Sequence, residues 1–312
     1  MLTYIFAAGS GLLLLFFGAE GLVRGSASLA FRLGVSALVI GLTVVAYGTS
    51  MPEMVVSIQA SLSHQGAISA GNVIGSNIFN IAAILGLAAL IRPLKVRIKL
   101  IRIDTPVLIG SAALFVLFFL DRKISRLEGL ILFAAAVGYT LFNLLAAGKE
   151  VRKAKTVNLG RPRMLPLFAE IAFISGGFVL LVVGSRLFVH GSVGIARAAG
   201  LSEAVVGLTI IAAGTSLPEL ATSLVASFRH QADIAVGNVV GSNIFNILAV
   251  MGIAALISPV DGTGIGTVDL VVLMTASLIL LPLLCTGFVL GRLEGGLLLA
   301  GYILYMGWLV VP

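Results

Sequence analysis

Charged side chains are scarce in this sequence. Of its 312 residues only 11% are Asp, Glu, Lys or Arg, whereas 59% are hydrophobic and the mean hydropathy is +1.14. A soluble domain carries about a quarter charged residues, because its surface faces water. The composition therefore excludes a soluble globular protein and predicts a chain that lies in a lipid bilayer.

Cysteine is limited to Cys285, so an intrachain disulfide framework is excluded and the redox compartment stays open. The first apolar run, residues 4–23, lacks preceding basic residues and a small-residue cleavage site. We therefore expect a membrane span there and not a removed signal. The net charge of +7 comes from short loops beside apolar runs, where basic residues set membrane orientation rather than bind nucleic acid.

Apolar runs follow one another along the whole chain, and a spanning helix needs about 20 mostly apolar residues. Some runs are continuous, and four longer ones are interrupted by Gly, Pro and polar residues. The short alternating segments of an outer-membrane barrel are absent. We therefore predict an all-α integral membrane protein with ten transmembrane helices. The runs are residues 4–23, 35–63, 66–91, 105–120, 127–147, 164–189, 201–228, 232–257, 267–290 and 293–311.

Two motifs occur twice, each pair 166 residues apart. Residues 41–53, GLTVVAYGTSMPE, match residues 207–219, GLTIIAAGTSLPE. Residues 71–81, GNVIGSNIFNI, match residues 237–247, GNVVGSNIFNI. The constant offset indicates gapless copies over about 75 residues, and hence five spans in each half.

An odd number of spans in each copy turns the second copy upside down in the membrane. Loop charge tests this inversion, because cytoplasmic loops carry an excess of Lys and Arg. Residues 92–102 carry five basic residues, whereas their copy at 258–268 carries none. Inverted repeats with Gly- and Pro-interrupted helices at matching positions are typical of secondary transporters, whose binding site lies near the membrane midplane.

The loop charges also predict an orientation. With both termini outside, fifteen of the twenty basic residues face the cytoplasm. The predicted organisation has a first repeat of five spans at 1–148, a short basic cytoplasmic linker at 149–163 and a second, inverted repeat at 164–312.

Glu53 and Glu219 occupy equivalent positions inside predicted spans. A charged side chain at the centre of a spanning helix costs about 2.5 to 3.5 kcal/mol, and neither motif supplies a Lys or Arg at that depth. We therefore expect a bound cation to compensate these carboxylates, and two carboxylates match one divalent ion. The alternative is a proline kink whose neighbouring hydroxyls bond to their own helix.

The residues around the glutamates are rich in oxygen, and a hard cation such as Ca²⁺ takes about six to eight oxygen ligands. Thr and Ser lie one turn before each glutamate, and a proline before each glutamate frees a backbone carbonyl. The facing spans carry Asn or Ser every four residues, although such residues also join packed helices. We assign the helix-joining role to Asn72, Asn77, Asn238 and Asn243. The candidate ligands are Thr49, Ser50, Ser76, Asn80, Thr215, Ser216, Ser242 and Asn246.

The paired GTSMPE and GTSLPE, together with the paired GNVIGSNIFN and GNVVGSNIFN, resemble the cation/calcium exchanger superfamily, specifically its prokaryotic sodium/calcium antiporters. The resemblance covers essentially the whole chain. It implies a plasma (inner) membrane protein of ten helices in two inverted five-helix repeats. It also implies that the first and sixth spans slide across a rigid core.

The same resemblance implies that Ca²⁺ and Na⁺ share Glu53 and Glu219. The hydroxyl and amide candidates named above would be further ligands, and the carbonyls of Ala46 and Ala212 would bind Na⁺. Some relatives have an aspartate where this chain has Asn246. We therefore expect two formal negative charges in the site, which leaves the stoichiometry open.

Two other charges, Glu20 and Arg186, occupy equivalent positions of the two copies. Each lies near a predicted helix end, where a long side chain reaches the membrane surface by snorkelling. The sequence favours snorkelling for both over an ion pair between the first and sixth spans.

These observations predict Na⁺/Ca²⁺ antiport by a protein that functions as a monomer in membrane lipid, with no cofactor besides the transported ions. Ca²⁺ exchange driven by protons is the alternative, because the residues do not identify the counter-ion. An intramembrane hydrolase using Ser50 or Ser216 is disfavoured, since no His or Lys base lies near either serine. A channel is disfavoured by the inverted duplication, which repeats no pore ring.

Overall fold

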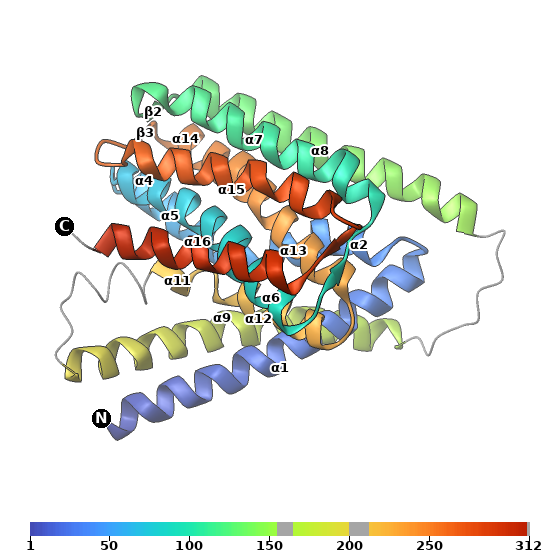
Figure 1. Ribbon diagram of the computed structural model, residues 1–312. Helices are drawn as coiled ribbons and strands as arrows, with labels where there is room; N and C mark the ends of the chain where they lie inside the picture. The colour runs from blue at the N-terminus through green and yellow to red at the C-terminus, as the bar shows by residue number, and fades with distance from the viewer. Residues whose placement is uncertain (155–164, 200–211, 311–312) are drawn as a thin grey trace.

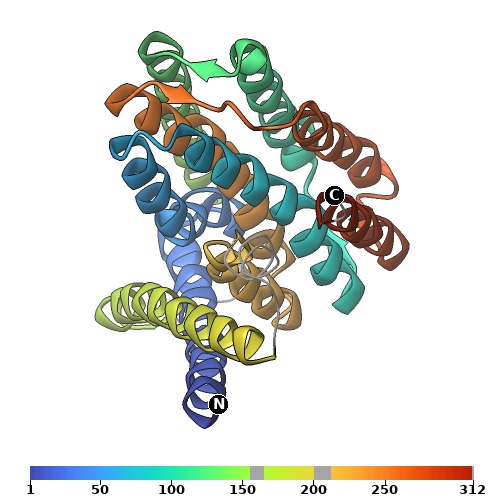
Figure 2. The same ribbon diagram turned by 90° about the vertical axis from the view of Figure 1, so that its left-hand side faces the viewer.

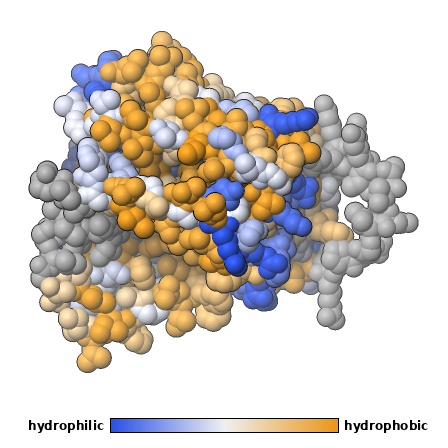
Figure 3. Space-filling view, in the orientation of Figure 1, coloured by the Kyte–Doolittle hydropathy of each residue, from blue (hydrophilic) through white to orange (hydrophobic). Residues whose placement is uncertain are grey.

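The computed structural model describes residues 1–154, 165–199 and 212–310, and most of these are helical (Figure 1). In the described part of the chain, seven helices are long and apolar enough to cross a membrane, or eight when a bent pair is counted as one span. Hydrophobic residues cover most of the face shown in Figure 3, with hydrophilic residues gathered toward the ends. The seven are α1 (Leu2–Leu33), α5–η2–α6 (Gly66–Ile91), η3–α7–η4 (Leu100–Asp121), α8 (Arg126–Ala154), α9 (Leu167–Ala198), α13–η6–α14 (Ala232–Ile257) and α15 (Thr267–Cys285).

The predicted run 35–63 is a broken span. Its two parts, Ala37–Thr49 (α2, η1 and α3) and Met51–Leu62 (α4), are bent by 45° at Ser50. Pro52 lies in the first turn of α4, where its missing N–H costs no helical hydrogen bond. A proline thus ends one helix and begins the next.

The second half repeats this arrangement where it is described. Residues 200–211 lie outside the described residues, and after them come α11 (Ala212–Gly214) and α12 (Leu217–Phe228). Pro218 lies in the first turn of α12. The last helix is α16 (Arg292–Val310). Helix α8 continues to Ala154 and so takes in the first six residues of the predicted linker, which include the good helix formers Lys, Glu, Arg and Ala.

The centre of the molecule is formed by the two spans that carry the GNVxGSNIFN motif. In their most apolar windows 72% and 83% of residues are buried, against 22% in α1 and in α9. Both central spans contain a π-helical turn, η2 (Phe79–Leu85) and η6 (Asn246–Val250). Such turns add a residue to the helix and are frequent at functional sites.

Helices α1 and α9 pack against each other below the other helices (Figures 1 and 2). They are antiparallel, because Arg32 at the end of α1 pairs with Glu170 at the start of α9, at 2.6 Å. Glycines let their backbones approach closely. A Cβ added to Gly18 would lie 2.9 Å from the Gly177 carbonyl, and one added to Gly177 would lie 2.8 Å from the Gly18 carbonyl.

Two short strand pairs correct the all-α expectation. Strand β1 (Leu94–Lys95) pairs with β4 (Val289–Leu290), and β2 (Lys123–Ile124) pairs with β3 (Val260–Asp261), both antiparallel. Each pair joins a loop of the first half to a loop of the second. Only two residues contribute to each strand, which is too short for an alternating pattern to be visible in the sequence. The fold is predominantly helical.

The glycine contact between α1 and α9 predicts unequal effects of two neighbouring substitutions. Gly177→Ala should destabilise the protein by about 1 to 3 kcal/mol, because its Cβ forces the backbones apart. Gly176→Ala is the matched control, since nothing lies within 4 Å of a Cβ added there. Thermal unfolding in detergent measures both. Equal transition temperatures for the two variants would contradict this packing.

Candidate functional site

Glu53 and Glu219 lie in the first turns of α4 and α12, and both are fully buried. The helix breaks at Ser50 and Ser216 expose two helix N-termini at this depth. The positive ends of the helix dipoles therefore point toward the carboxylates and partly offset the cost of burying negative charge.

Each glutamate is hydrogen-bonded to the break in the opposite half. Ser50 Oγ donates to Glu219 Oε1 at 2.7 Å, and Ser216 Oγ donates to Glu53 Oε1 at 2.8 Å. These reciprocal bonds bring the two copies of the GTSxPE motif together, as the sequence predicted for a single site.

Several of the candidate ligands have a buried side-chain oxygen without a hydrogen-bond partner. These oxygens are the Oε2 atoms of Glu53 and Glu219, Ser76 Oγ and Asn80 Oδ1, and the side-chain amide of Asn246 makes no hydrogen bond at all. Buried polar atoms without partners cost free energy and are rare in folded proteins. Carboxylate, hydroxyl and amide oxygens are the ligands of hard cations such as Ca²⁺. The donor set therefore fits a cation.

Hydroxyls of two other candidates lie between the halves. Ser242 Oγ lies 3.4 Å from both Glu219 Oε1 and the carbonyl of Ala46. Thr49 Oγ1 lies 3.3 Å from the same carbonyl and donates to Asn238 Oδ1 at 3.0 Å. The carbonyl of Ala46 thus faces the polar centre between the halves, next to a carboxylate ligand candidate.

The asparagines that begin the polar stripes fasten helices together, as expected. Asn72 Nδ2 donates to the carbonyl of Glu53 at 3.1 Å and to Ser57 Oγ at 2.9 Å. Asn238 makes the matching bonds in the other half, at 3.3 and 3.0 Å. The sequence interpretation missed Ser57 and its copy Ser223. Each lies four residues after a glutamate, on the same helix face.

The two remaining candidates are less well connected to the carboxylates. Thr215 Oγ1 donates to Asn72 Oδ1 at 3.3 Å. The carbonyl of Gly214, which the following proline frees, accepts a hydrogen bond from Ser185 Oγ of α9 at 2.6 Å and so has a protein partner. Ala212 begins α11, but its surroundings lie outside the described residues.

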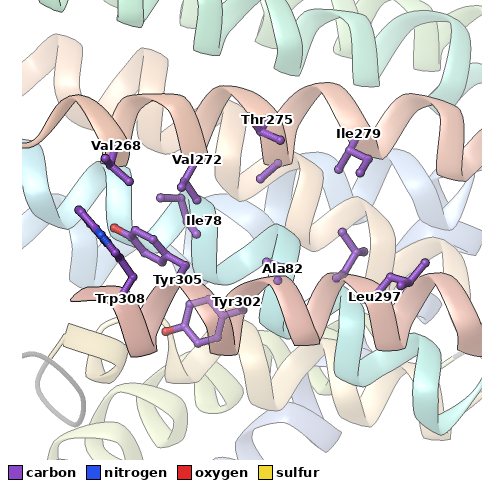
Figure 4. A pocket seen from close by; sticks show the side chains of 13 residues that line it. Ile78, Ala82, Val268, Val272, Thr275, Ile279, Leu297, Tyr302, Tyr305 and Trp308 are labelled. Carbon is purple, nitrogen blue, oxygen red and sulfur yellow. The ribbon is translucent and has the colours of Figure 1, made fainter. Parts of the chain in front are cut away.

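The cavity in Figure 4 is not this site. It has a volume of about 380 Å³ and lies between α15 and α16, where Tyr302, Tyr305 and Trp308 contribute aromatic rings. No acidic side chain lies among its described lining residues. A second cavity, of about 560 Å³, separates α9 from α4 and α11. It reaches Pro52 and Thr215, beside the glutamates, and we name it the α9 cavity.

Comparison with known proteins identifies the family. A family model described as sodium/calcium exchanger protein matches residues 3–145 and again residues 170–311. The chain is 39% identical over 306 residues to the putative antiporter CaxA of Alkalimonas amylolytica, covering 95% of both chains. It is 38% identical to the inner membrane protein YrbG of Escherichia coli (strain K12), covering 96% of this chain and 94% of that protein.

A relative named for its activity and a solved structure agree with this match. The chain is 34% identical to the sodium/calcium exchanger MaX1 of Methanosarcina acetivorans, covering 95% of both chains. Its fold matches a structure of the sodium-calcium exchanger NCX_Mj soaked with Na⁺ and Sr²⁺, with a TM-score of 0.85, 32% identity and 98% of each chain covered. This integral membrane protein therefore belongs to the sodium/calcium exchanger family, whose members are exchangers and not enzymes.

Proposed function

We propose that this protein is a secondary active antiporter that exchanges Na⁺ for Ca²⁺ at one site near the membrane midplane. The observation that carries the proposal is the reciprocal pairing of Glu53 with Ser216 and of Glu219 with Ser50, which leaves one oxygen of each carboxylate free. Two free anionic oxygens between two halves of a membrane protein suit a divalent cation.

The proposed ion ligands come from both halves. The carboxylates supply the charge, and neutral oxygens complete the coordination of Ca²⁺ or of Na⁺. With Asn246 in place of an acidic residue, the proposed site holds two formal negative charges. The proposed ligands are Glu53, Glu219, Thr49, Ser50, Thr215, Ser216, Ser76, Asn80, Ser242 and Asn246, with the carbonyls of Ala46 and Ala212 for Na⁺.

Sharing the glutamates explains why transport is an exchange. Ca²⁺ and Na⁺ cannot both occupy the same two carboxylates, so one ion must leave before the other binds. An empty site holds two buried charges without compensation, which is costly. The site therefore switches from one side of the membrane to the other only when an ion is bound. Each ion can shift this equilibrium only by the difference in its binding free energy between the two states.

We propose that ten spans form two inverted repeats, at 1–148 and 164–312, joined by a cytoplasmic linker at 149–163. The two strand pairs support the inversion, because β1 and β3 are copies 166 residues apart, as are β2 and β4. One pair therefore maps onto the other when the halves are exchanged. In this arrangement both termini lie outside, the inner membrane is the location, and one chain suffices for transport.

Replacing either glutamate by its neutral amide tests the site. Glu53→Gln and Glu219→Gln should each reduce ⁴⁵Ca uptake into proteoliposomes by about 100-fold, because losing one partner of a buried charge contact costs roughly 3 kcal/mol. Glu128→Gln is the control, since Glu128 is a partly buried residue in the first turn of α8 that accepts hydrogen bonds from Ser125 of the same turn. Full uptake by both glutamate variants, in well-folded protein, would refute the assignment.

The driving gradient tests the counter-ion. With Na⁺ inside the proteoliposomes and none outside, ⁴⁵Ca should accumulate, and dissipating the Na⁺ gradient with an ionophore should abolish the accumulation. A pH gradient alone should drive no uptake, because Na⁺ is the ion that competes for the glutamates. Uptake that follows the pH gradient and ignores Na⁺ would instead support Ca²⁺/H⁺ exchange at the same site.

A further inference from the structure

Glu20 is held by two arginines, so the expectation that it snorkels to the membrane surface is wrong. The guanidinium of Arg229 contacts both carboxylate oxygens, with Nε 2.7 Å from Oε2 and Nη2 2.6 Å from Oε1. Arg24, one helical turn further along α1, also pairs with Glu20. Glu20 is 9% exposed. A carboxylate this buried needs such partners, and a hydrogen bond between charged groups is strong.

This ion pair joins helices that carry different parts of the mechanism. Glu20 belongs to α1, which packs along α9. Arg229 directly follows α12, the helix that begins beside Glu219. Movement of α1 along α12 must therefore break the contact between Glu20 and Arg229, because their hydrogen bond of 2.7 Å is lost once the two atoms move apart by more than about 1 Å.

The α9 cavity lies toward the opposite end of the α1–α9 pair. Arg32 and Glu170 mark the end near Glu20, where α1 finishes and α9 begins. The cavity is lined by the later part of α9, including Arg186 and His190. The ring of His190 contacts Tyr4 near the start of α1, at a centroid distance of 5.8 Å. Ion pairs thus hold this helix pair near one end, and the α9 cavity lies beside the glutamates toward its other end.

The duplication does not provide a copy of the contact between Glu20 and Arg229 at the end of the helix pair where the α9 cavity lies. The residues 166 positions after Glu20 and Arg24 are Arg186 and His190, and Ser63 lies 166 positions before Arg229. None of these three equivalents is acidic, so they cannot form a mirrored carboxylate–arginine pair. An inverted-repeat transporter exchanges the surroundings of its halves when its site changes sides. Exchanging these surroundings would therefore break the contact between Glu20 and Arg229 without forming its mirror image.

We propose that the contact between Glu20 and Arg229 is a latch that holds the site open toward the α9 cavity and closed toward the cytoplasm. Both residues act as positioning residues, since neither is among the proposed ion ligands. The absence of a mirrored latch favours this outward-facing state at rest, and losing the latch should shift the balance of states about tenfold. The proposal rests on alternating access at the site described above.

A thiol on the cytoplasmic side of the site would report the shift. Thr222 is the copy of Val56, which lines the α9 cavity, and Thr222 is fully buried here. Inward opening should expose it. In a Cys285→Ser background, Thr222→Cys would be labelled with a membrane-impermeant maleimide from the cytoplasmic face of inside-out vesicles. Glu20→Gln and Arg229→Gln should each raise the labelling rate about tenfold, whereas Arg186→Gln, the matched control, should not change it.

A variant that adds an ion pair distinguishes a latch from a contact that only stabilises the fold. Ser63→Glu places a carboxylate where it pairs with Arg186 when the outer end closes, and it leaves Glu20 intact. This variant should also raise labelling, and adding Arg186→Gln should cancel the increase. Unchanged labelling in Glu20→Gln, Arg229→Gln and Ser63→Glu would overturn the latch. If no ionic condition ever exposes the thiol in the parent protein, alternating access itself fails, and the latch with it.

Discussion

The structure is organised around two carboxylates that lie in a bilayer and that pair with no basic side chain in the described part of the chain. Burying Glu53 and Glu219 is acceptable only because each lies at a helix N-terminus and accepts a hydrogen bond from a serine of the opposite half. Both conditions require broken helices, which the prolines after Ser50 and Ser216 supply. The free oxygens that remain are the reason for proposing an ion there.

Duplication explains why this arrangement occurs in both halves. Positions at which the two copies differ make the two sides of the protein unequal. The serine–glutamate bonds, the asparagine bonds and the strand pairs all occur twice with exchanged halves. Glu20 breaks the symmetry, because its copy is Arg186. A perfectly symmetric exchanger would face both sides equally. The ion pair between Glu20 and Arg229 has no mirrored copy, and we propose that it gives the protein its preference for one side.

The sequence indicated the candidate ligands through local pattern, and their role as ligands stays a prediction. A repeated motif with a glutamate, a proline and hydroxyls on one helix face needs no tertiary information, and the glutamates were correctly expected to be brought together. The sequence could not reveal which serine bonds which glutamate, since that depends on packing between halves. It also missed Glu20, whose partner Arg229 lies 209 residues away, and the strands, which are too short to form a pattern. The use of the Gly214 carbonyl by Ser185 was equally invisible.

Locating the ion directly is the strongest test of the central claim that both halves build one cation site. Crystals soaked in Sr²⁺, a heavy analogue of Ca²⁺, should give a single strong anomalous scattering peak between the carboxylates of Glu53 and Glu219. Raising Na⁺ should remove that peak, because both ions use the same carboxylates. A peak elsewhere in the protein, or one between the glutamates that Na⁺ does not diminish, would contradict the shared site.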